Sequence, residues 1–437
     1  MGESDWKIRF HMTAHKMKLL WKSGYVKIMI SVFALFLADI LFYAGNSAWE
    51  REGYAANGAL YLADGVNIYA FIETDSIDYG EIRDEICNGN ADAVKERYEN
   101  ANVSKDVPDQ YAAVQNILGI AEIYLGEYER AYEYFIGTID YVNNSQMSEK
   151  EGILAVLHNN AGAVALSRRR RGMWDEHMNQ AAGYCEDPYM ELAVELNHVI
   201  RPEREEKVEY GRLVGHMVRL IRKERQIKGT TGVIGYEAAN YMAIGYVMCG
   251  KEKKGKRILD RYIERIPDTP EYNMLRALLF VSKSDLYRID GEFEKAGGCL
   301  HTAIAEAGKT ADRRSVIMSG YYIKHAQIYR ELCDWKNEFL CVKKAMRGAR
   351  YAASDWKGGV CLFMAHAYEM FDEDEQAKKY AIKSCLYYQR LGGEYDGEAI
   401  SMLRNIFRRG KYDETDFHQW VEDELQKADI EDEADFR

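Results

Sequence analysis

Small and aromatic residues recur at helical spacing along most of the chain beyond residue 110. Residues 118–135 read LGIAEIYLGEYERAYEYF, and their apolar positions fall on one face of each of two short helices. The pair Leu118-Gly119 permits close approach of two helices, and Gly126 allows the chain to turn between them. The second helix then presents a packing face formed by Tyr128, Ala131 and Phe135. The pattern predicts a helix–turn–helix unit.

The unit recurs downstream. Similar patterns occupy residues 242–267, 284–303, 326–345 and 365–381, and a looser copy runs from Ala161-Gly162 to Ala181. The predicted turns are at Gly126, Gly172, Gly250, Gly291, Cys333 and Asp372. They are separated by 46, 78, 41, 42 and 39 residues, so the interval of 78 holds one additional unit. Residues 189–228 supply it, as a helix at Tyr189–Arg201, a break at Pro202 and a helix at Glu203–Lys228. About seven helix pairs are expected.

These units resemble the tetratricopeptide repeat family, although their period near 40 residues exceeds the family's value of about 34. The resemblance implies an all-α fold, a right-handed superhelix of helix pairs known as an α-solenoid. One pair cannot bury its apolar face alone, so pairs stack and create a concave and a convex side. The resemblance also implies that the protein binds another protein or a peptide in the concave groove.

A hydrophobic segment near the N-terminus predicts a membrane anchor. Ile28–Ala44 is an apolar run of 17 residues interrupted by Asp39. The carboxylate costs about 2.5–3.5 kcal/mol, which a dozen apolar residues at about −0.3 to −0.6 kcal/mol each should outweigh. A cleaved signal peptide is an alternative, but no Ala-x-Ala-like cleavage site follows. A buried soluble helix is a second alternative. We favour an uncleaved transmembrane helix at residues 28–45.

The charges flanking this segment predict its orientation. Residues 1–27 carry a net charge of +4, whereas the remainder of the chain carries −16. The positive-inside rule therefore predicts a cytoplasmic N-terminus and a repeat array outside the cytoplasm. The acidic body argues against non-specific nucleic-acid binding, which requires cationic surface.

These patterns divide the chain into five parts. They are a basic segment at 1–27, the anchor at 28–45, a helical connector or degenerate first repeat at 46–110, the repeat array at 111–391, and a cap with an acidic tail at 392–437. Within the connector, Tyr54–Phe71 and Ala91–Ala101 have helical patterns. The cap consists of predicted helices at Asp396–Arg409 and Thr415–Lys427.

The sequence offers little catalytic chemistry. KGTTGVIG at 228–235 lacks the order of a phosphate-binding loop, and the histidines are scattered singly. The eight cysteines form no Cys-x-x-Cys pair, and most lie within apolar helical patterns. The run Arg168–Arg171 is either an anion-binding patch or a solvated loop between helices. We expect no enzymatic activity, catalytic residue, metal site or cofactor.

An asparagine series is the sharpest candidate site. Asn116, Asn159 and Asn240 each precede the small-residue pair of a first helix by two residues, and Asn197 lies on the helix between the last two. The spacings are 43, 38 and 43 residues. A side-chain amide donates and accepts simultaneously, so a row of amides in the groove can hold an extended backbone of any sequence. Alternatively, the amides bond neighbouring helices or water.

We expect these asparagines to be exposed, so that replacing them weakens binding rather than folding. The equivalent later positions, Val281, Ile323 and Leu362, are apolar and would select apolar ligand side chains. The leading hypothesis is a membrane-anchored adaptor or scaffold that binds a protein or peptide. The alternatives are a receptor for small signalling peptides and an accessory subunit of a membrane enzyme or secretion assembly.

Overall fold

The computed structural model divides the chain into two compact units, Met1–Gly58 and Ala59–Arg437. It describes residues 61–428 except 64–66, 73, 75–76, 102, 148–149, 168–170, 200–209, 312–315, 351, 353, 390–396 and 411–415. The predicted anchor at 28–45 and the basic segment at 1–27 lie outside the described residues. Within the described part, no helix has both the length and the apolarity needed to cross a membrane.

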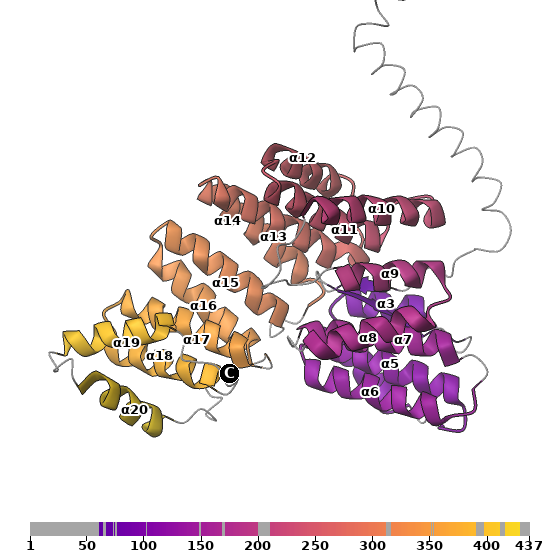
Figure 1. Ribbon diagram of the computed structural model, residues 1–437, viewed down its shortest axis with the longest axis horizontal. Helices are drawn as coiled ribbons and strands as arrows, with labels where there is room; N and C mark the ends of the chain where they lie inside the picture. Colours follow the sequence, from indigo (N-terminus) through magenta and orange to yellow (C-terminus); the bar gives the residue numbers. More distant parts are fainter. Residues whose placement is uncertain are drawn as a thin grey trace, which may run out of the picture. The chain divides into compact units, whose positions relative to one another are not determined.

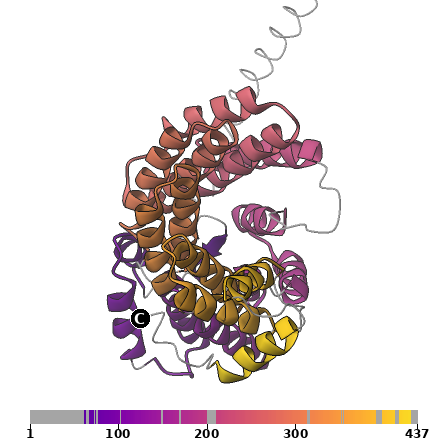
Figure 2. The ribbon, with the colours of Figure 1, turned by 90° about the vertical axis from the view of Figure 1, so that its left-hand side faces the viewer.

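The second unit is a succession of antiparallel helix pairs that follow one another in chain order (Figures 1 and 2). The pairs are α5 (Pro108–Leu125) with α6 (Tyr128–Asn144), α7 (Lys150–Ser167) with α8 (Arg171–Tyr184), α9 (Pro188–Val199) with α10 (Tyr210–Lys228), α11 (Val233–Met248) with α12 (Glu252–Ile263), α13 (Asn273–Ile289) with α14 (Phe293–Ala307), α15 (Val316–Glu331) with α16 (Trp335–Gly348), and α17 (Ser354–Glu369) with α18 (Asp374–Gln389). The predicted α-solenoid of seven central pairs is confirmed across the described ranges.

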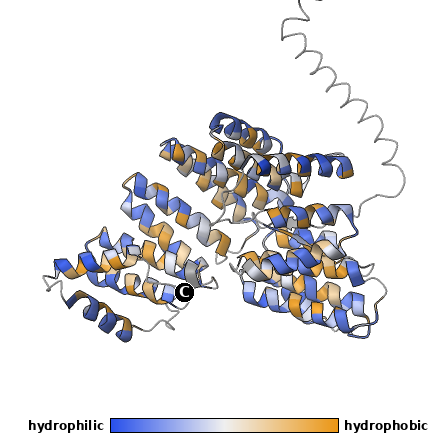
Figure 3. Cartoon of the chain, viewed as in Figure 1, coloured by the Kyte–Doolittle hydropathy of each residue, from blue (hydrophilic) through white to orange (hydrophobic). Residues whose placement is uncertain are grey.

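Further elements flank these pairs. α3 (Tyr79–Cys87) and α4 (Ala91–Glu99) precede α5, and the single turn η1 (Pro270–Tyr272) precedes α13. α19 (Gly397–Arg409) and α20 (Phe417–Lys427) follow α18 and correspond to the two predicted C-terminal helices. Most helices carry both hydrophobic and hydrophilic residues, with hydrophilic residues prominent on α12 (Figure 3).

Glycines mark the closest approaches within helix pairs. A Cβ added at Gly119 on α5 would lie 2.5 Å from the Phe135 ring on α6. At Gly162 on α7, a Cβ would lie 2.4 Å from Met178 on α8. Phe135 and Met178 are fully buried. The predicted role of the small-residue pair, to let two helices touch, is confirmed at both positions.

Five of the six predicted turns adopt the left-handed conformation that ends a helix sharply. The φ angles are 86° at Gly126, 71° at Gly250, 74° at Gly291, 56° at Cys333 and 58° at Asp372. The prediction at Gly172 is wrong, because that residue lies within the first turn of α8.

The helix predicted at Tyr54–Phe71 is also wrong over its described part. β1 (Tyr61–Ala63) and β2 (Ile68–Ala70) form an antiparallel two-stranded sheet, with Leu62 opposite Tyr69. Residues 68–72 read IYAFI and are apolar throughout, which suits a strand buried on both faces. The helix predicted at Ala91–Ala101 is present as α4.

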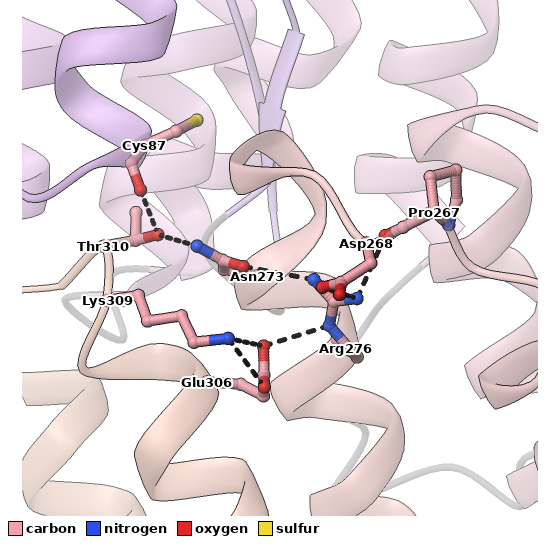
Figure 4. Close-up of polar contacts among 8 residues, drawn as sticks. All are labelled: Cys87, Pro267, Asp268, Asn273, Arg276, Glu306, Lys309 and Thr310. Carbon is pink, nitrogen blue, oxygen red and sulfur yellow. Dashed lines mark hydrogen bonds and ion pairs between the residues drawn. The ribbon is translucent and has the colours of Figure 1, made fainter.

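Polar contacts join the start of this unit to helices that follow it by about two hundred residues (Figure 4). Thr310 donates to the carbonyl of Cys87 at 2.6 Å and accepts from Asn273 at 3.3 Å. Arg276 donates to Asn273 at 3.2 Å and to Glu306 at 3.0 Å. The end of α3 is thereby fixed against α13 and the end of α14.

One apolar core extends across the same junction. It combines Tyr69, Phe71 and Ile72 with residues of α3 to α7 and of α13 to α15. β2 contacts α7 and α9, and β1 contacts α11. The two strands therefore lie on the inner side of the helix pairs (Figure 2).

Candidate polypeptide-binding site

The first helices of consecutive pairs bring the predicted asparagines to one side of the array. Asn116 lies on α5, Asn159 on α7, Asn197 on α9 and Asn240 on α11, and neighbouring members of this helix series are in contact. The four side chains are 0–1% exposed. The expectation that they are open to solvent is therefore wrong, and for Asn116, Asn159 and Asn197 the reason is a segment of the chain itself.

Ile68 in β2 is held through its backbone by two asparagines. Its N–H donates to Asn197 Oδ1 at 2.9 Å. Its carbonyl accepts from Nδ2 of Asn159 and from Nδ2 of Asn197, both at 2.9 Å. Both backbone polar groups of this residue are satisfied by side-chain amides.

Ala70 is held in the same manner, two residues further along. Its N–H donates to Asn160 Oδ1 at 2.9 Å, and its carbonyl accepts from Asn160 at 2.8 Å and from Asn116 at 3.0 Å. Residues two apart in a strand direct their polar groups to the same edge. The asparagines thus bind one edge of β2, while its other edge pairs with β1, so the amides take the place of a neighbouring strand.

The amides also bond one another in a continuous row. Asn197 donates to Asn159 at 2.9 Å, Asn159 to Asn160 at 3.1 Å, and Asn160 to Asn116 at 2.8 Å. We call Asn116, Asn159, Asn160 and Asn197 the asparagine row. Each amide in it is oriented by its neighbours, which fixes the geometry presented to the bound backbone.

The series predicted from sequence differs from this row at two positions. Asn240 is buried on α11, and its Oδ1 has no hydrogen-bond partner within the described part of the chain. It lies outside the row. Asn160 was missed, although the doublet Asn159-Asn160 was a visible signal. Adjacent helical residues diverge by about 100°, and this divergence lets one amide reach Ile68 and the next reach Ala70.

The side chains of the bound segment enter different surroundings on its two faces. Ile68 packs in a cluster with residues of α9, α10 and α11, and Ala70 packs with Ala181, Met190 and Val194. Tyr69 and Phe71 point into the core shared with α5 and α13, where Phe71 meets the Tyr79 ring at 5.9 Å between centroids. Every residue from Ile68 to Ile72 is at most 6% exposed.

The helix pairs, the glycine contacts and the periodic left-handed turns together decide the fold type. The chain is a repeat array of stacked antiparallel helix pairs, the architecture that its resemblance to tetratricopeptide repeats predicts. No protein-family model and no curated protein matches its sequence. One similar solved structure is an IFIT1 monomeric mutant with Gppp-AAAA, with 11% identity and a TM-score of 0.33 over 79% of this chain and 86% of that chain. Another is Cut9-Hcn1 of the APC/C, with 9% identity and a TM-score of 0.31 over 76% of this chain and 63% of that chain. A third, BtubC from P. vanneervenii, has 14% identity and TM-score 0.24 over 61% and 90%.

The apolar positions that follow the asparagines in the repeat array are not equivalent to one another. Val281 on α13 is buried in the core that contains Tyr69, and Ile323 on α15 is buried in a separate core with α16 to α20. Leu362 on α17 is partly exposed. Their predicted role in selecting apolar ligand side chains stays a prediction.

Two histidines that appear isolated in the sequence are in contact. His158 Nδ1 and His177 Nδ1 lie 2.9 Å apart, and His177 Nε2 is 3.1 Å from the Tyr132 hydroxyl. Burial lowers the pKa of His158 to about 4, aided by the charge of His177, and burial also lowers the pKa of His177. The two residues are 19 positions apart in the sequence and meet because α7 and α8 pack against each other.

A side chain occupies the N-terminus of α11, which begins within residues 228–235. Glu224 accepts hydrogen bonds from the backbone N–H groups of Gly232, Ile234 and Gly235 at 2.8–3.1 Å. The Tyr189 hydroxyl donates to the same carboxylate at 2.8 Å. This carboxylate fills the position at the start of α11 where a phosphate would bind.

The eight cysteines differ in their exposure. Cys87, Cys341, Cys361 and Cys385 are buried thiols, and Cys185, Cys249, Cys299 and Cys333 are at least partly exposed. Across the described ranges, no group of His, Cys, Asp and Glu side chains has the geometry of a metal site. Of the run Arg168–Arg171, only the start of α8 at Arg171 belongs to the described residues.

Proposed function

We propose that this protein is a membrane-tethered, non-enzymatic scaffold that binds an extended polypeptide segment along the asparagine row. The observation that supports the proposal is the set of six hydrogen bonds from the row to the backbone of Ile68 and Ala70. Backbone contacts do not depend on the side chains of the bound chain. The row therefore has the chemistry required to hold extended segments of different sequence.

The ligand that fits this chemistry is a peptide in β conformation. Such a strand presents an N–H and a carbonyl on the same edge at every second residue, matching the amides that meet Ile68 and Ala70. The net charge of −12 disfavours a polyanion such as RNA, because binding it requires cationic surface.

A peptide array probed with the full 437-residue chain tests this function. Extended apolar peptides should bind wild type or the variant Phe71→Ala. This variant weakens the binding of the internal β2 segment to the asparagine row. Asn116→Ala should reduce binding when it is added to Phe71→Ala, where the internal segment competes least, since it removes one bond to the Ala70 position. Asn144→Ala is the matched control, because Asn144 is exposed on α6 and bonds only the Asp140 carbonyl. Failure of every peptide to bind both wild type and Phe71→Ala would refute the function.

The membrane tether and its orientation rest on the sequence alone. The basic flank before Ile28, and the scarcity of Lys and Arg after Ala44, favour an array outside the cytoplasm. A reporter fused after Arg437 should be active on that side, and protease added to intact cells should cleave the array. A reporter active only in the cytoplasm would overturn the orientation.

A further inference from the structure

The segment Asn67–Ile72 is bound to the array as a peptide ligand would be. Its backbone forms hydrogen bonds with side chains that lie 46 to 129 residues away in the sequence. The segment belongs to no repeat, and in the described part of the chain its sheet contains one other strand, β1. The contacts that hold it are the same contacts on which the proposed function rests.

Seven of the eight amide protons of the asparagine row are already used in hydrogen bonds within the described part of the chain. Asn160 uses both amide protons, for Ala70 and Asn116, and its oxygen accepts from Ala70 and Asn159. Asn197 uses both protons, for Ile68 and Asn159, while its oxygen accepts from Ile68. Ile68 and Ala70 are buried against the row, so a second peptide can form the same backbone bonds with these amides only where this segment leaves.

The surroundings of the segment define which peptide can replace it. The site of Ala70 is enclosed by Ala181, Met190 and Val194 and admits a small side chain. The flanking positions of Tyr69 and Phe71 accept aromatic side chains in the core. The preferred ligand therefore has a small residue between two large apolar residues, in extended conformation.

We infer that Asn67–Ile72 is an intramolecular pseudo-ligand, and that the asparagine row binds an external extended peptide of this pattern only in exchange for it. The inference depends on the proposed function and adds the ligand pattern and its regulation. When the internal segment occupies the site most of the time, the apparent association constant for an external peptide is the intrinsic constant multiplied by the fraction of time that the site is free. Weakening the internal segment raises that fraction.

The test uses the full chain and a fluorescent peptide that copies residues 66–73, VNIYAFIE, with added lysines for solubility. Phe71→Ala should raise the affinity for this peptide about tenfold or more over wild type, because it increases the free fraction. Phe407→Ala is the matched control, since it removes another buried phenylalanine, on α19, that is not part of the segment. It should leave the affinity unchanged. A peptide carrying Phe at the Ala70 position should bind at least tenfold more weakly.

Hydrogen exchange supplies a measurement that needs no variant. Saturating wild type with the peptide should accelerate exchange at the amides of Ile68 and Ala70 in the protein, because displacement exposes them to water. Peptide binding with those amides still protected would overturn the inference while leaving the proposed function intact. Equal affinity for wild type and Phe71→Ala would also overturn it. Absence of binding by any peptide, in this assay and on the array, would overturn both proposals.

Discussion

At the residue scale, the side-chain amide connects sequence to site. Its ability to donate and accept at once made an evenly spaced asparagine series a candidate for binding a backbone, and three of the four predicted residues meet at β2. The occupant could not be predicted, because the Ala-rich stretch around residues 54–64 has a local helical pattern that conceals the strands. Asn240 has the expected spacing but lies on α11, outside the asparagine row.

Replacing Asn197 by Ala should destabilise the protein instead of only weakening ligand binding. The substitution leaves the buried N–H of Ile68 without its acceptor, and its carbonyl keeps only the bond from Asn159. An unsatisfied buried group costs about 1–3 kcal/mol. Asn144→Ala, on the exposed face of α6, should change the free energy of unfolding by less than about 0.5 kcal/mol. Urea denaturation of both variants measures the difference. Equal stability of the two variants would show that the bonds to Ile68 contribute nothing.

The paired imidazoles should make stability depend on pH. Protons bind His158 and His177 less readily in the folded state, where burial lowers both pKa values, than in the unfolded chain, where the value is about 6.5. The unfolded state therefore binds more protons as pH falls. The stabilisation is fully present above about pH 6.5, and it is lost as pH falls toward the folded pKa of His158, about 4.

Urea midpoints measured between pH 7.5 and 4.5 test this dependence. Wild type should lose stability across that range more steeply than His177→Gln, which removes one imidazole and keeps a polar side chain. Tyr132 and Tyr184 also face the pair. Parallel pH profiles for wild type and the variant would assign the dependence to carboxylates elsewhere.

At the element scale, the helix pairs follow from local rules. Small residues mark helix contacts and left-handed turns end first helices, which is why the pattern predicted α5 to α18 closely. The exceptions have physical causes. Gly172 falls inside α8, where a glycine is tolerated in a first turn. β2 is stabilised by long-range amide contacts that no local pattern encodes.

Gly119→Leu should strongly destabilise the α5–α6 pair. A Cβ added at this position would lie 2.5 Å from the Phe135 ring, and Phe135 is fully buried and cannot move away. Overpacking of this kind costs about 1–3 kcal/mol or more. The same substitution at Gly137 on α6, where nothing lies within 4 Å, is the control and should be neutral or stabilising. Thermal melts that shift equally for both variants would contradict the close approach.

At the scale of the whole molecule, the number and order of helix pairs could be predicted, because the repeat period is written in the sequence. The junction between α3 and α13 could not. Thr310 bonds the Cys87 carbonyl across 223 positions, and neither residue belongs to a repeating pattern. Contacts between distant repeats depend on the sum of the small rotations between neighbouring helix pairs. A small change in each of these rotations alters which distant residues meet.

Removing residues 392–437 should expose the apolar face of α18 and cause aggregation. Leu403 and Phe407 on α19 and Phe417 on α20 are buried, and they share a core with Ala381 and Cys385 of α18. Solenoids need a terminal unit with a polar outer face to remain soluble. A shorter deletion of residues 429–437 removes only the acidic tail and should leave the protein monomeric. Light scattering and circular dichroism on both truncations distinguish the two roles. A 391-residue chain that stays monomeric and retains full helicity in α18 would show that α19 and α20 do not act as a cap.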